Sequence, residues 1–139
     1  MPGFSKIALG LSLTLCLAGA AVGHADEAKT RSFTDERGVA VQVPAHPQRI
    51  ASISYFATDV AFALGLKPVA TTYMVANRYP EYLLGLTKDI KQIGQRAKPN
   101  LELLSEAKPD LIVAMKRYTV GNADALQKIA PYVAYNMEL

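Results

Sequence analysis

Residues 94–114, GQRAKPNLELLSEAKPDLIVA, enclose a short helical pattern between two prolines. Pro99 interrupts the segment before it, and Asn100 is a residue type that readily caps the N-terminus of a helix. The helix must end ahead of Pro109, because the residue before a proline is disfavoured in the helical conformation. The spacing therefore predicts a short helix that begins directly after Asn100.

The side chains around that helix indicate what it packs against. Leu101, Leu104 and Ala107 fall on one helical face, whereas Glu102 falls on another. Residues 111–115, LIVAM, then form an unbroken apolar run. Such a run is typical of a strand in a parallel sheet that is covered on both faces.

The same alternation of short helices and strands extends over most of the chain. A hairpin is predicted at residues 31–43 with Gly38 in its turn. A helix is predicted at 58–66, with Thr58 or Asp59 as its N-cap and Gly65 at its C-terminal end. The other expected elements are strands at 49–53, 68–72, 90–93 and 132–135, a helix at 123–129, and one helical turn near Tyr82 in the irregular segment 73–89. This order predicts an α/β fold with a mostly parallel sheet, a single Rossmann-like lobe preceded by a β-hairpin.

The N-terminal residues do not belong to this lobe. Lys6 precedes an apolar run at 7–22, and the small residues around Ala25 suit cleavage by a signal peptidase. The alternative, a membrane anchor, needs roughly 20 apolar residues, more than this run supplies. We therefore expect a signal peptide at 1–25 and a folded lobe at 26–139.

Composition narrows the class of protein. The chain has 139 residues, a net charge of +3, one cysteine and two histidines. It has no Lys/Arg-rich run, which argues against nucleic acid as a partner. Cys16 lies inside the predicted signal, so the exported part has no disulfide, as is compatible with a bacterial periplasm. With a single histidine left after cleavage, a histidine-based metal site is not expected.

A ligand site is expected where the parallel strands end, because their carboxyl ends meet at one edge of the sheet. Cationic and phenolic side chains follow several predicted strands, and guanidinium groups bind carboxylates and other oxyanions. The candidates for an anionic organic ligand are Tyr55, Tyr73, Arg96, Arg117 and Tyr118. The plainer alternatives are that the arginines are solvated surface residues and that the tyrosines are packing residues.

Enzymatic signatures are scarce in this chain. It contains no G-x-G-x-x-G, no P-loop and no G-x-S-x-G. A nucleophile paired with a base is hard to assemble from one histidine and no cysteine. The sequence therefore favours a binding protein over an enzyme.

Four segments carry a resemblance to a known family. They are FTDERGVAVQVPAHPQRIAS, ATDVAFALGLKPVA, IGQRAKPNLELLSEAKPDLIVA and ALQKIAPYVAY. Together they resemble the periplasmic substrate-binding proteins of iron-siderophore and vitamin B12 ABC importers. The ferric-citrate and ferric-hydroxamate branches are the most similar, because both have an arginine in the place of Arg96.

The resemblance implies a fold of two α/β lobes joined by a long helix, with the ligand between them. It implies a monomer in the periplasm that takes up a ferric siderophore and delivers it to a membrane permease. Arg96 and Tyr118 match ligand-binding positions, and Glu102 and Asp124 match positions that dock on the permease. Iron would arrive inside its chelate, so neither a cofactor nor a direct metal ligand is expected.

Other interpretations stay open at this point. The same fold could bind haem or a corrinoid, and a small exported α/β enzyme is a less favoured alternative. The sequence stops at Leu139, where family members enter the connecting helix. We therefore expect only the N-terminal lobe, either as a fragment or as a truncated lobe without a function of its own.

Overall fold

A computed structural model describes residues 29–137 of the chain. The expected signal peptide at 1–25 lies outside the described residues. No helix within residues 29–137 has both the length and the apolar character needed to cross a membrane.

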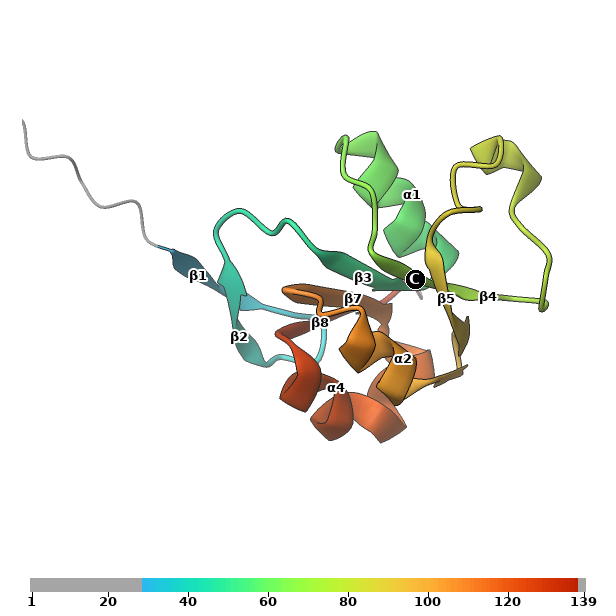
Figure 1. The fold of residues 1–139 in the computed structure, drawn as a ribbon. Helices are drawn as coiled ribbons and strands as arrows, with labels where there is room; N and C mark the ends of the chain where they lie inside the picture. Colours follow the sequence, from blue (N-terminus) through green and yellow to red (C-terminus); the bar gives the residue numbers. More distant parts are fainter. Residues whose placement is uncertain (1–28, 138–139) are drawn as a thin grey trace, which may run out of the picture.

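The described chain forms a two-stranded hairpin and one α/β lobe (Figure 1). The hairpin consists of β1 (Thr30–Thr34) and β2 (Ala40–Pro44). The strands of the lobe are β3 (Ile50–Ile53), β4 (Ala70–Tyr73), β5 (Lys91–Gln95), β6 (Lys98–Pro99), β7 (Leu111–Met115) and β8 (Tyr132–Tyr135). The helices are α1 (Tyr55–Ala63), α2 (Leu101–Glu106), α3 (Lys116–Thr119) and α4 (Ala123–Ile129), with 3-10 turns η1 (Glu81–Leu83) and η2 (Val120–Asn122).

The six strands of the lobe follow the order β6-β5-β4-β3-β7-β8. All neighbouring pairs are parallel except β5 with the short β6. The chain moves outward from β3 through β4 to β5, and then returns to the other side of β3 with β7 and β8. The direction of winding thus reverses between β3 and β7, and ligands of open α/β sheets bind at such a switch point.

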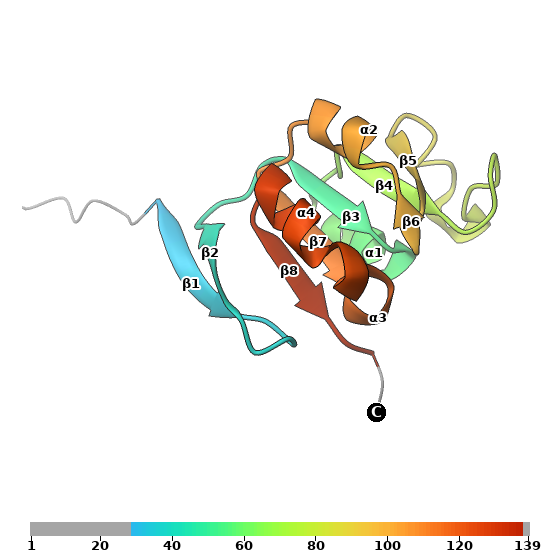
Figure 2. The same ribbon diagram turned by 90° about the horizontal axis from the view of Figure 1, so that it is seen from below.

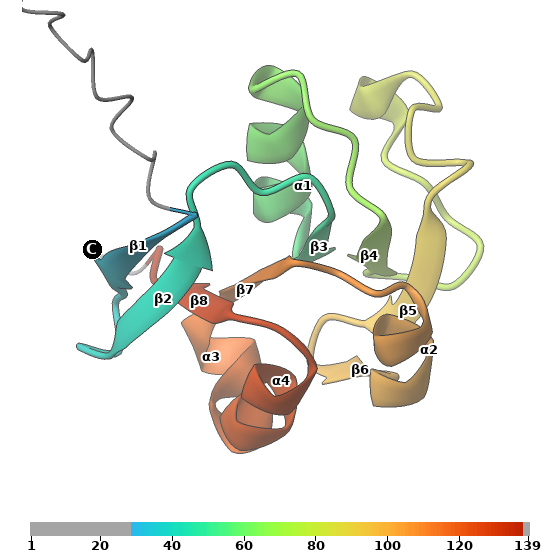
Figure 3. The ribbon, with the colours of Figure 1, turned by 60° about the vertical axis from the view of Figure 1, so that its left-hand side comes forward.

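Helices cover both faces of the sheet. Helix α1 and the segment around η1 lie on one face, and α2, α3 and α4 lie on the other (Figures 2 and 3). Apolar side chains from the strands and from α2 and α4 form the core between these layers. Its fully buried members include Ile53, Ile93, Leu104, Ile112 and Leu126. The predicted single α/β lobe with a mostly parallel sheet and a preceding hairpin is confirmed.

The segment 94–114 folds as its prolines predict. The side chain of Asn100 accepts a hydrogen bond from the backbone N–H of Leu103, which caps α2. Lys108 adopts a positive φ of 47° directly before Pro109, so the helix cannot continue. Leu104 has no exposed surface, and Ala107 is 8% exposed, which confirms the predicted buried face.

Helix α1 begins earlier than predicted. Its N-cap is Ser54, whose hydroxyl accepts from the N–H of Ala57, and neither Thr58 nor Asp59 has that role. Thr58 is fully buried, and its hydroxyl bonds to those of Ser52 and Thr71. The hydroxyl of Thr58 is therefore used in hydrogen bonds inside the lobe and does not cap the helix. The helix ends at Ala63, before the predicted bound at residue 66, and the predicted role of Gly65 at its C-terminal end is confirmed by a φ of 74°.

The segment after β7 was not predicted to be regular. Its residues form α3 and η2 before α4 begins. The short β6 was also missed, since it pairs with β5 over only two positions. These short elements, α3, η2 and β6, depend on contacts made by the folded lobe rather than on a periodic pattern in the sequence.

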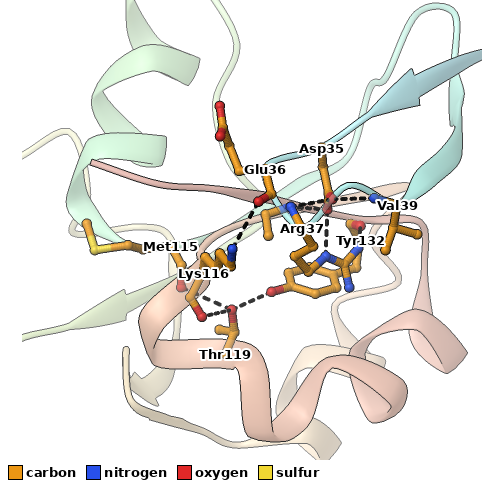
Figure 4. A network of polar contacts seen from close by, with 9 residues as sticks. Asp35, Glu36, Arg37, Val39, Met115, Lys116, Thr119 and Tyr132 are labelled. Atoms are coloured by element: carbon orange, nitrogen blue, oxygen red, sulfur yellow. Dashed lines mark hydrogen bonds and ion pairs between the residues drawn. The ribbon is translucent and has the colours of Figure 1, made fainter. Parts of the chain in front are cut away.

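The turn of the hairpin is tied to the outer strand β8 (Figure 4). Asp35 accepts hydrogen bonds from Arg37 Nε at 2.7 Å and from the N–H of Ala134 at 2.9 Å. Arg37 also donates to the carbonyl of Tyr132 at 3.0 Å, and its guanidinium carbon lies 4.2 Å from the centre of the Tyr132 ring. The hydroxyl of Tyr132 bonds to that of Thr119 in α3. The hydrogen bonds that Asp35 and Arg37 make to β8, together with the stacking of Arg37 on Tyr132, therefore join the hairpin to the lobe.

The environment of Asp35 favours its charged form. Burial alone raises the pKa of this carboxyl. The hydrogen bonds from Ala134, Arg37 and Val39 outweigh burial, and the pKa is lowered from its ordinary value of 3.8. Asp35 is thus the counter-charge that keeps Arg37 compensated inside the protein.

Candidate ligand-binding site

The parallel strands bring the candidate residues to one edge of the sheet. Tyr55 follows β3, Tyr73 ends β4, and Arg96 follows β5. Arg117 and Tyr118 lie in α3, directly after β7. The structure therefore gathers all five at the carboxyl ends of the strands, where the order of winding reverses.

Two guanidinium groups flank Tyr118. The guanidinium carbon of Arg96 is 4.4 Å from the centre of its ring, and that of Arg117 is 4.7 Å from it. Arg117 Nη2 also donates to the Tyr118 hydroxyl at 2.6 Å. That hydrogen bond, followed by the positive charges of Arg96 and Arg117, lowers the pKa of Tyr118. The three side chains form one cationic and aromatic cluster that spans the switch point.

The charge of Arg96 is not compensated by its neighbours. Among residues 29–137, no carboxylate lies within ion-pair distance of its guanidinium. We name the hollow beside it the edge pocket; it has a volume of about 250 Å³ and is lined by Tyr73, Met74, Gln95, Arg96, Ala97 and Tyr118. A guanidinium without a carboxylate partner in such a hollow suits an oxyanion.

The hydroxyl of Tyr55 bonds to the segment that follows β4. It accepts from the N–H of Met74 at 3.3 Å and donates to the carbonyl of Arg78 at 3.5 Å. The ring therefore supports the segment that follows β4. Further along this segment, the hydroxyl of Tyr82 donates to both oxygens of Asp59 in α1 at 3.1 Å. Desolvation and the adjacent carboxylate raise the pKa of Tyr82 to about 12.

A second hollow opens between this segment and α1, and sequence reasoning missed it. We name it the tyrosine pocket; it has a volume of about 580 Å³ and is lined by Tyr55, Met74, Val75, Arg78, Tyr79, Pro80, Glu81 and Tyr82. Apart from the helical turn predicted near Tyr82, which η1 confirms, the segment 74–82 has no periodic pattern, so the sequence did not indicate a pocket. The available hint was a group of three tyrosines, Tyr73 at the end of a parallel strand and Tyr79 and Tyr82 after it.

The two predicted docking carboxylates lie on different helices. Glu102 is exposed in the first turn of α2, and Asp124 is exposed in the first turn of α4. Both helices cover the same face of the sheet (Figure 2). Neither carboxylate lines the edge pocket.

A doubly wound lobe with a cationic pocket at its switch point defines a solute-binding module. A family profile described as periplasmic binding protein matches residues 50–138. The chain belongs to this periplasmic binding protein family, as its sequence segments predicted. The family is one of binding proteins.

Individual relatives agree with this assignment. The chain is 36% identical over 106 residues to the probable siderophore-binding lipoprotein YfiY of Bacillus subtilis, covering 76% of this chain and 33% of that protein. It is 36% identical over 87 residues to the Fe(3+) dicitrate-binding periplasmic protein FecB of Escherichia coli, covering 61% and 29%. The crystal structure of Staphylococcus aureus SirA complexed with staphyloferrin B superposes with a TM-score of 0.71 at 39% identity, covering 76% and 36%. The chain thus spans about a third of the length of the relatives it matches.

Proposed function

We propose that this chain forms one lobe, the N-terminal one, of an exported solute-binding protein that captures a ferric siderophore for an ABC importer. The observation that carries the proposal is the uncompensated Arg96 beside Tyr118 at the switch point. The names of the relatives, which bind siderophores or ferric citrate, support the same ligand class. The partner lobe would supply the other half of the site, and iron would stay inside its chelate.

Export and delivery complete the proposal. The protein would lose residues 1–25 on export, act in the periplasm as a monomer, and dock on the permease through Glu102 and Asp124. Intact-mass analysis of the exported protein tests the first step. A mature chain that starts at Asp26 is expected, and a protein that retains Lys6 and the apolar run would contradict cleavage.

Ligand capture is tested with the protein expressed from its complete reading frame. Tyrosine fluorescence should be quenched on titration with ferric citrate, because phenol rings line the edge pocket. Arg96→Gln should weaken binding by about 10- to 100-fold, since a hydrogen bond to a charged group contributes about 1.5–3 kcal/mol. Arg31→Gln removes the same charge from the exposed strand β1 and should leave affinity unchanged.

Two outcomes would contradict the proposal. If Arg96→Gln and Arg31→Gln bind ferric citrate equally, the edge pocket is not the site. If haem displaces ferric citrate and binds more tightly in direct competition, the ligand class is wrong even though Arg96 is used.

A further inference from the structure

Two pockets of different chemistry adjoin at the carboxyl edge of the sheet. Met74 lines both the edge pocket and the tyrosine pocket, so the two hollows meet at this side chain. The edge pocket contains the uncompensated guanidinium of Arg96. A single bound molecule could therefore extend from one hollow into the other.

The lining of the tyrosine pocket has no net charge. The two charged side chains in its lining, Arg78 and Glu81, have opposite signs. The rest of its lining consists of three tyrosines, Met74, Val75 and Pro80. The formal charges of this lining thus sum to zero, whereas the lining of the edge pocket carries the positive charge of Arg96.

The hydroxyl groups of two of these tyrosines are already used. Tyr55 bonds to the backbone of Met74 and Arg78, and Tyr82 bonds to Asp59. Their rings therefore remain as the recognition surface. The same bonds fasten both ends of the segment 74–82, so the pocket is formed without a ligand.

The volume of the tyrosine pocket suits a ring. A cavity of about 150 Å³ holds benzene, and this hollow has about 580 Å³. Aromatic side chains favour offset or edge-to-face contacts with another ring, beyond the burial of its area. The lining thus fits a flat apolar group better than a carboxylate arm.

We propose that the natural ligand is amphipathic, with oxyanions that bind Arg96 in the edge pocket and an aryl arm that fills the tyrosine pocket. This inference rests on the proposed function, and it specifies the chemistry of the chelate. Tyr79, which is 37% exposed in the pocket wall, is the residue that would select for the arm. Simple ferric citrate, which has no such arm, would leave the tyrosine pocket empty.

The test compares two ferric chelates that differ only in the arm. Citrate monobenzylamide and citrate monomethylamide keep the same hydroxycarboxylate head and charge, and only the first has a phenyl ring. Their ferric complexes are titrated into the protein expressed from its complete reading frame. The wild type should bind the benzylamide complex about tenfold more tightly. Tyr79→Ala should remove this preference, and Tyr79→Phe, which keeps the ring, should retain it.

The two proposals fail in different ways. If both chelates bind equally, or if the preference survives Tyr79→Ala, the aryl arm is wrong and the tyrosine pocket is a packing surface for another part of the protein. Ferric citrate binding that depends on Arg96 would still stand in that case. If Arg96→Gln has no effect on any of the chelates, the proposed function falls and this inference falls with it.

Discussion

Arginine stacks on tyrosine in two regions of this lobe, and the stacks differ in their counter-charge. Arg37 lies 4.2 Å from the centre of the Tyr132 ring and pairs with the carboxylate of Asp35. Arg96 lies 4.4 Å from the centre of the Tyr118 ring, and no described carboxylate pairs with it. The side chain of Arg37 is 9% exposed and that of Asp35 is fully buried, whereas the second stack borders a pocket.

The difference shows how the same residue pair acquires two uses. An arginine whose charge is neutralised by the protein attracts an anionic ligand only weakly. It contributes to stability only as part of its ion pair. An arginine without a carboxylate at an open edge can take its counter-charge from a bound anion. The position of one carboxylate therefore separates the structural stack from the stack for which we propose ligand binding.

The largest effect is expected from removing the buried carboxylate. Asp35→Asn should lower the free energy of unfolding by about 3–5 kcal/mol, because Arg37 would remain buried without its counter-charge. Urea denaturation measures this loss. Asp89→Asn is the matched control, since the Asp89 side chain is 87% exposed and 4.0 Å from Lys67. It should change stability by no more than about 0.5 kcal/mol. Equal losses in the two variants would contradict the structural role of the first stack.

A smaller effect is expected from giving the second stack a carboxylate. Gln95 lines the edge pocket beside Arg96, so Gln95→Glu should compete with a bound anion. We expect the affinity for ferric citrate to fall about tenfold, which corresponds to about 1.4 kcal/mol. Gln127→Glu adds the same charge on the exposed surface of α4 and should change affinity by less than about twofold, since exposed charges are screened. An unchanged affinity in Gln95→Glu would show that Arg96 is not the anion contact.

The smallest effect is a pH dependence confined to the first stack. The pKa of Asp35 is lower in the folded state than its ordinary value of 3.8. Its carboxylate therefore stabilises the fold fully above the unfolded pKa, and this contribution is lost as the pH falls through the folded pKa. Urea midpoints measured from neutral pH to below about pH 4 should fall more steeply for the wild type than for Asp35→Asn. Parallel curves would indicate that Asp35 titrates alike in both states.

Local signals predicted much of the fold. Asn100 and Pro109 were enough to predict the start and the end of α2, because each acts on the backbone of its own sequence neighbours. The start of α1 could not be found in the same way. Ser54, Thr58 and Asp59 are all residue types that cap helices. Only in the folded core is the hydroxyl of Thr58 used in other hydrogen bonds.

The candidate site was predictable in part. The predicted strand ends were enough to place Arg96 and Tyr118 at one edge of the sheet, because the carboxyl ends of parallel strands lie at the same edge. They could not reveal that Tyr55 supports the segment 74–82, nor that this segment encloses a pocket. Nor could they identify Arg37 as the structural arginine, because the ring and the carbonyl of Tyr132 reach it only when the hairpin and β8 come together.

The bond from Ala134 to Asp35 joins residues 99 positions apart. During synthesis, the hairpin around Gly38 can form early, but its carboxylate finds this partner only after nearly the whole lobe has emerged. Contacts so distant in sequence close late, because the intervening chain must first be ordered. The hairpin can therefore be fastened to the lobe through Asp35 only after β8 has been synthesised, long after its own turn can form.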